Sequence, residues 1–189
     1  MNALFLRVPK TASTSIVNTM RSGDKNITYV RTGKRLNAIE RHNERFDLEK
    51  VFTFGFVRNP WDRAVSSWKF GGHKSEWKMS FIDFCKNLKT LDLFPPDKIA
   101  KSSLLLHACE QHPFLICEEK GLRASFIGKF ENLQNDFDAI CEKIGIPSKT
   151  LPHCKKTKHK HYAEYYDDES RELVAKKYAK DIKYFGYEF

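Results

Sequence analysis

The chain has 189 residues, of which 41% are hydrophobic and 30% charged, so length and composition fit a soluble globular domain and exclude a disordered chain. No apolar run approaches the length that crosses a membrane, and the first ten residues show no signal-peptide pattern. The net charge of +9 indicates an anionic partner: a nucleic acid, a nucleotide, an acidic glycan or a membrane surface.

The first third of the chain predicts strands separated by a helix. Leu4–Val8 and Ile27–Arg31 have the character of strands, and Thr14–Met20 that of the helix between them. Val51–Val57 (VFTFGFV) is an unbroken apolar run, as expected of a strand that is covered on both faces of a parallel sheet.

Two helices are predicted next. Pro60 ends the apolar run, and Asp62 suits the N-cap of a helix that continues to about Phe70. Ser80 can cap a second helix that continues to about Leu88.

The second half repeats the alternation of strands and helices. Strands are predicted at Phe114–Cys117 and Ser125–Phe130, and a last helix at about Asp168 to Ile182. Between them, apolar residues recur at helical spacing and Gly145 and Pro147 end the helix; these residues are Leu133, Phe137, Ile140, Cys141 and Ile144.

This alternation predicts an α/β fold, a three-layer sandwich around a parallel sheet. No linker interrupts it, so residues 1–189 are predicted to form a single domain. The cysteines are odd in number and widely spaced without a CxxC pair, which predicts reduced thiols; they are Cys85, Cys109, Cys117, Cys141 and Cys154. Reduced thiols and the lack of a membrane anchor favour a cytoplasmic protein, although a trimmed lumenal domain also fits.

A candidate anion site follows the first strand. Residues 7–15 (RVPKTASTS) connect that strand to its helix, and ligands of α/β sheets bind at the carboxyl ends of strands. A helix N-terminus offers backbone N–H groups, small hydroxyl residues add donors, and Lys10 adds a mobile cation. The pattern GxxxxGK[ST] is absent, so the segment is not a Walker A loop. The alternative is an ordinary capped helix start with a surface lysine.

A second candidate motif, residues 56–68 (FVRNPWDRAVSSW), follows the most apolar strand. Arg58 lies at the strand's carboxyl end and Ser66 in the following helix, and an arginine with a hydroxyl suits a terminal phosphate. An ion pair between Arg58 and Asp62, with Ser66 as a helix-face residue, is the structural alternative.

Together the two motifs resemble those of PAPS-dependent carbohydrate sulfotransferases, the Golgi-type enzymes and their bacterial relatives; PAPS is 3′-phosphoadenosine-5′-phosphosulfate. RVPKTASTS is most similar to the loop of heparan sulfate 2-O-sulfotransferases. The segments IGKFENL, within residues 126–133, and YFGYEF, residues 184–189, resemble stretches of bacterial members and are interpreted as packing elements. The resemblance therefore spans nearly the whole chain, and acceptor specificity is expected to lie in the divergent residues 69–116.

The resemblance implies a P-loop-NTPase-like sulfotransferase fold and a role for each motif residue. It implies that Lys10 contacts the bridging oxygen and sulfuryl group, with Arg7 close by. Arg58 and Ser66 would grip the 3′-phosphate. Backbone amides and hydroxyls would hold the 5′-phosphate, in the segment Thr11, Ala12, Ser13, Thr14 and Ser15.

Transfer to a hydroxyl needs a general base, and histidine is the usual choice near neutral pH. His42 lies between the two motifs, the interval in which 2-O-sulfotransferase-like members keep a catalytic histidine. The rival is His107, whose surroundings resemble the HxxPQ segment of bacterial relatives without its proline. A surface or helix-face role is the alternative for both histidines, and carboxylates are further candidates for the base: Glu40, Glu44 and Glu110.

Residues 153–161 form the densest basic run. Four lysines would repel a metal ion from its possible ligands, so no metal is expected there; those ligands are His153, Cys154, His159 and His161. A solvated charged loop is one interpretation. The resemblance instead implies a segment that closes over the nucleotide, with Thr157 and Lys158 as the contacts.

The sequence therefore predicts a sulfotransferase that moves a sulfuryl group from PAPS to a hydroxyl of a carbohydrate, releasing PAP, the 3′,5′-bisphosphate. A P-loop-like kinase or NTPase and a non-catalytic polyanion-binding module are the alternatives. Neither nucleic acid nor a membrane span is expected, and the acceptor and the oligomeric state stay open.

Overall fold

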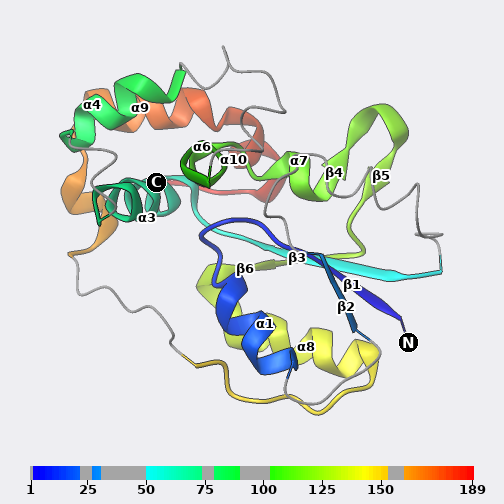
Figure 1. Ribbon diagram of the computed structural model, residues 1–189. Helices are drawn as coiled ribbons and strands as arrows, with labels where there is room; N and C mark the ends of the chain where they lie inside the picture. The colour runs from blue at the N-terminus through cyan, green and yellow to red at the C-terminus, as the bar shows by residue number, and fades with distance from the viewer. Residues whose placement is uncertain (1, 22–26, 31–49, 74–78, 90–102, 153–159) are drawn as a thin grey trace. The chain divides into compact units, whose positions relative to one another are not determined.

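The computed structural model describes residues 2–21, 27–30, 50–73, 79–89, 103–152 and 160–189 (Figure 1). They form two compact units. The first, here the sheet unit, contains the described residues between 2 and 57 and between 113 and 152. The second, here the helical unit, contains those between 58 and 112 and between 160 and 189. The single domain expected from the sequence stays a prediction.

The sheet unit is built on four parallel strands in the order β2-β1-β3-β6. These strands are β1 (Ala3–Leu6), β2 (Ile27–Val30), β3 (Phe52–Val57) and β6 (Phe126–Lys129). Each strand lies within or beside a predicted one, and the parallel pairing confirms the predicted α/β fold. The central strands β1 and β3 are almost entirely apolar because nearly all of their side chains, which alternate between the two faces of the sheet, are buried.

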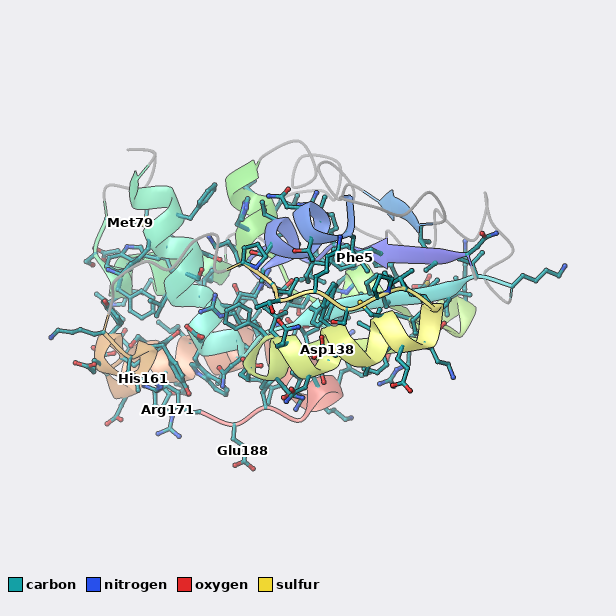
Figure 2. The ribbon with its side chains drawn as sticks, turned by 90° about the horizontal axis from the view of Figure 1, so that it is seen from below. Phe5, Met79, Asp138, His161, Arg171 and Glu188 are labelled. Carbon is teal, nitrogen blue, oxygen red and sulfur yellow. The ribbon has the colours of Figure 1, made fainter. Side chains whose placement is uncertain are left out.

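Two helices cover one face of this sheet, α1 (Ser13–Arg21) and α8 (Leu133–Ile144), which lie side by side in Figure 1. Phe5 and Phe54 stack with their ring centroids 5.0 Å apart, and Ile16 and Phe137 of the helices join the same buried cluster (Figure 2). Gly145 ends α8 with a φ of 77°, as predicted. The apolar residues that recur at helical spacing in the sequence therefore form the face that α8 buries.

Leu115 packs against the sheet at Gly55. A Cβ atom on Gly55 would lie 2.3 Å from Leu115 Cδ2 and 2.8 Å from the Leu6 carbonyl oxygen, so only glycine fits. Leu115 ends the short helix α7 (His112–Leu115), which precedes the antiparallel pair β4 (Ile116–Cys117) and β5 (Leu122–Arg123) with the 3-10 helix η2 (Glu118–Lys120) between them. The predicted strand Phe114–Cys117 is thus wrong in its first half. A short apolar run does not separate a strand from a buried helix, and Pro113 suits a first helical turn.

In the sheet unit, the 3-10 helix η3 (Phe130–Asn132) connects β6 to α8. The helical unit consists of helices without a sheet strand among its described residues. The helical elements are α3 (Pro60–His73), α4 (Phe81–Asn87), α6 (Ser103–Ala108), η4 (Tyr162–Tyr165), α9 (Asp168–Lys177) and α10 (Ala179–Phe185). Ser80 caps α4 by accepting a hydrogen bond from the Asp83 backbone N–H, as predicted.

Two helix boundaries correct the sequence predictions. Asn59, not Asp62, caps α3: its Oδ1 accepts the Trp61 N–H at 3.0 Å, and Pro60 takes the first helical position. The predicted last helix is two helices, because Tyr178 leaves helical geometry between them. The Tyr178 hydroxyl donates to the Ala108 carbonyl at 2.6 Å, a long-range bond that sequence periodicity does not contain.

The C-terminal segment packs on aromatic rings, which agrees with the packing role inferred from the sequence. Phe189 meets Trp61, Tyr162 and Tyr166 edge-on at 5.4 to 5.7 Å between ring centroids. The adjacent Glu188 carbonyl accepts a 2.8 Å hydrogen bond from the Asn59 amide. The residue that caps α3 therefore also anchors the end of the chain.

Candidate functional site

The loop after β1 has an unusual backbone. Lys10 and Ala12 have positive φ angles, 70° and 57°, although neither is glycine. This left-handed conformation costs about 1–2 kcal/mol for a residue with a Cβ atom, and such strain concentrates at ligand-binding segments. Alternating backbone signs of this kind turn successive N–H groups inward, which forms a concave anion-binding surface.

Helix α1 starts at the end of this loop. Its hydrogen-bond ladder begins with the Ile16 N–H, which donates to the Ala12 carbonyl at 3.2 Å. The N–H groups of Ser13, Thr14 and Ser15 precede that bond and have no acceptor within the helix. The positive end of the helix dipole lies at the same place and also favours an anion. The loop and the start of α1 therefore both suit an anionic ligand.

Two side chains brace the loop from within. Thr11 is fully buried, and its hydroxyl donates to the Val8 carbonyl at 2.9 Å. Arg7 Nη2 donates to the Ser13 hydroxyl oxygen at 3.4 Å. The Thr11 hydroxyl thus closes the loop from within, and the predicted role of Thr11 at the 5′-phosphate stays a prediction.

Arg58 follows β3, the direct neighbour of β1 in the sheet. Its guanidinium lies against Asp62, with Nε 2.9 Å and Nη2 2.7 Å from Asp62 Oδ2. The ion pair that the sequence offered as the structural alternative therefore exists. A guanidinium carries five N–H donors, so one ion pair does not in itself exclude contact with an anion.

Ser66 is half-buried on α3 and lies one helical turn after Asp62. Residues four apart share a helix face, so the carboxylate that holds Arg58 and the Ser66 hydroxyl are neighbours on α3. The joint contact of Arg58 and Ser66 with one phosphate stays a prediction.

Gln111 is a neighbour of Arg58 that the sequence did not single out. It is fully buried, and its side-chain amide bonds both backbone groups of Arg58. Its one signal in the sequence is its place four residues after His107, in the stretch that resembles HxxPQ.

His107 is half-buried, with its ring stacked on Phe70 at 4.4 Å between centroids. Its carbonyl accepts a 2.7 Å hydrogen bond from the Ser67 hydroxyl. These contacts match the helix-face role that was the alternative to catalysis. Glu110, another candidate base, is also half-buried.

Several predicted site residues lie outside the described part of the chain. They are His42, Glu40, Glu44, Thr157 and Lys158, and, among the possible metal ligands, His153, Cys154 and His159. His161 is described: its ring accepts the Ala163 N–H and caps η4. Among the residues that the structure describes, no group of three or more histidine, cysteine or acidic side chains could hold a metal ion.

Two buried cysteines among the described residues have unreactive thiols. Cys85, Cys109, Cys117 and Cys141 are free thiols. Burial raises the pKa of Cys85 and of Cys109 to about 12 in each case. These two thiols are therefore protonated at neutral pH and are not nucleophiles.

The sequence of the chain matches the model of the sulfotransferase family over residues 2–188, and the chain belongs to that family. A search of curated proteins found no match. No described helix has the length and apolar character needed to span a membrane.

The fold is also similar to a crystal structure of a sulfotransferase from Alicyclobacillus acidocaldarius. The two chains share 12% sequence identity with a TM-score of 0.59, and the match covers 97% of this chain and 93% of the other. At this identity the likeness shows a shared fold. Family and fold together assign the protein to sulfuryl transfer in general.

Proposed function

We propose that the protein transfers a sulfuryl group from PAPS to a hydroxyl group of a carbohydrate acceptor. The observation that carries the proposal is the glycine-free loop after β1, in which Lys10 and Ala12 take positive φ angles directly before a helix N-terminus. That backbone suits a 5′-phosphosulfate, which presents several anionic oxygens to N–H donors.

Each motif takes one end of the donor in this proposal. Backbone groups of Thr11 to Ser15 hold the 5′-phosphate, and Arg58 with Ser66 holds the 3′-phosphate. ATP has no 3′-phosphate, so a second phosphate motif favours PAPS over ATP. In this proposal Lys10 and Arg7, from the same loop, meet the sulfuryl group.

The reaction is an in-line displacement. The acceptor oxygen forms a bond to sulfur while the bond from sulfur to the bridging phosphate oxygen breaks, and PAP leaves. Lys10 stabilises the negative charge that develops on the bridging oxygen, as positioned cations do in phosphoryl transfer. The acceptor proton passes to a general base, for which we propose His42, with His107 as the rival.

No metal is required in this scheme, because a lysine, an arginine and a helix N-terminus supply positive charge to the leaving group. The net charge of +9 supports an acidic glycan as acceptor, since a basic surface attracts polyanions. Activity that EDTA abolishes and magnesium restores would instead favour the NTPase-like alternative.

A thermal-shift panel tests the proposal against its two alternatives. PAP, ATP and a heparin fragment are compared at equal concentration, because a ligand that binds only the folded state raises the melting temperature. PAP should raise it most. A larger shift with ATP would indicate an NTPase or kinase, and a shift with heparin alone would indicate a polyanion-binding module.

A further inference from the structure

The Gln111 side chain is bonded to the backbone of Arg58 in two directions. Gln111 Oε1 accepts the Arg58 N–H at 2.9 Å, and Gln111 Nε2 donates to the Arg58 carbonyl at 2.8 Å. The Gln111 side-chain amide thus makes the two hydrogen bonds to the Arg58 backbone that a neighbouring strand would make within a sheet. Gln111 has no exposed surface, so loss of either bond would leave a buried backbone group without its partner.

A buried carboxylate holds Gln111 in turn. Asp181 of α10 has no exposed surface, and its Oδ2 accepts the Gln111 N–H at 2.7 Å. Its Oδ1 accepts the His112 N–H at 2.8 Å and lies 2.9 Å from His112 Nδ1. A carboxylate is buried at little cost only when its oxygens are satisfied in this way, so the position of Asp181 and the backbone at Gln111 depend on one another.

The Arg58 residue is therefore held at both ends. Gln111 fixes its backbone and Asp62 fixes its guanidinium, 2.7 Å away. An arginine recognises a phosphate by the direction of its N–H groups, and a small rotation of its backbone redirects all of them.

We infer that Gln111 is a positioning residue for the 3′-phosphate contact of Arg58, and that Asp181 keeps Gln111 in place. The inference rests on the proposed function, because it assumes that Arg58 meets the 3′-phosphate of the donor. Gln111 is fully buried and bonds the Arg58 backbone, so the inference gives it no catalytic role. Its effect reaches the nucleotide through Arg58.

The test is the preference for PAP over adenosine 5′-phosphate, which lacks the 3′-phosphate, measured as a ratio of dissociation constants by calorimetry. Gln111→Met keeps the length of the side chain and removes both bonds to Arg58. The ratio should fall by about tenfold, the equivalent of one buried hydrogen bond, while the affinity for adenosine 5′-phosphate stays unchanged. An unchanged ratio would overturn the inference.

Thr53→Val is the matched control. Thr53 is buried on β3, the strand that Arg58 follows, and its hydroxyl exchanges hydrogen bonds with Ser125. The substitution should lower the melting temperature and leave the ratio unchanged. A ratio that falls in both variants would mean that general destabilisation explains the effect, and the inference would fail.

Asp181→Asn is the second variant, and it decides the question if Gln111→Met does not fold. It keeps the shape of the side chain and weakens its hold on Gln111, so the ratio should fall in the same direction. In an Arg58→Ala background neither change should lower the ratio further, which a merely structural role would not predict.

The preference of the wild-type protein for PAP distinguishes a failure of the proposed function from a failure of this inference. A wild-type protein without any preference for PAP would remove the proposed function and this inference together. A wild-type preference that Gln111→Met and Asp181→Asn both retain would remove the inference alone.

Discussion

The loop after β1 and the residues after β3 are both candidates to hold a phosphate, but they use different types of hydrogen-bond donor. In the loop the donors are backbone N–H groups, aimed by positive φ angles at Lys10 and Ala12. After β3 the donor is the guanidinium of Arg58, held by Asp62 and Gln111. A backbone site depends on chain conformation, whereas a side-chain site depends on the partners that orient one charge.

The comparison has a practical consequence. Truncating a side chain in the loop leaves most of its anion donors in place, so ground-state binding should survive. Truncating Arg58 removes the donors themselves. Substitutions in the loop should therefore lower kcat, whereas substitution of Arg58 should lower the affinity for the donor.

The largest effect is expected from the base, which belongs to neither phosphate contact. His42→Ala should lower kcat by about 10²–10⁴-fold with PAP binding retained, the usual contribution of a positioned general base. In the wild-type protein kcat should rise with pH across the range in which a histidine loses its proton, because the neutral imidazole is the active form.

His107→Ala and His161→Ala are the controls for this prediction, since His161 caps η4 and is exposed. A full loss of kcat at His107 with a mild effect at His42 would transfer the role to His107. Mild effects at both would point to a carboxylate such as Glu110.

Lys10→Ala tests the loop as a site of chemistry. We expect kcat to fall by about 10²–10³-fold, because Lys10 is assigned to charge that appears only as PAP leaves. PAP affinity should change little. Steady-state rates and calorimetry measure the two quantities, and Lys143→Ala removes an exposed charge of the same unit as a control. An equal loss in affinity and kcat would make Lys10 a ground-state anchor.

Arg58→Ala tests the second region. It should erase most of the preference for PAP over adenosine 5′-phosphate, because a charge-assisted contact contributes about 1.5–3 kcal/mol. The binding of adenosine 5′-phosphate should be nearly unchanged. Arg171→Ala, at an exposed arginine over the Phe189 ring, should leave the preference intact. Retention of the preference in Arg58→Ala would remove the 3′-phosphate assignment.

Ala12→Gly should have the smallest effect and the opposite sign. Glycine adopts a φ of 57° without strain, so the substitution should raise the free energy of unfolding by about 0.5–1 kcal/mol. Ala139→Gly, at an exposed position inside α8, should lower it by about 0.5–1 kcal/mol. Urea denaturation measures both. A destabilised Ala12→Gly would show that the loop is not strained.

Local patterns predicted much of the fold. The apolar run at Val51–Val57, the Ser80 cap and the Gly145 stop each depend on neighbouring residues, and each is confirmed. The break at Tyr178 was missed, and the hydrogen bond of the Tyr178 hydroxyl to a residue 70 positions away is a contact that no local pattern contains. The Asp62 cap failed because Asn59 takes the cap and Asp62 turns to Arg58.

The candidate site divides in the same way. Its motifs were found from residue types and order, which a sequence displays. The positive φ angles were not predicted, since alanine and lysine carry no signal for them. Gln111 and Asp181 were not predicted either, because a buried polar residue shows its purpose only when its distant partner is known.

Gly55 has a consequence for how mutational data on this protein will be interpreted. In a saturation library, position 55 should tolerate glycine alone, because any Cβ atom meets the Leu6 carbonyl oxygen, a backbone atom that cannot move aside. Such a profile looks the same as that of a catalytic residue. Its origin is the width of the gap between two strands, so intolerance at this position reports distance within the sheet and not chemistry.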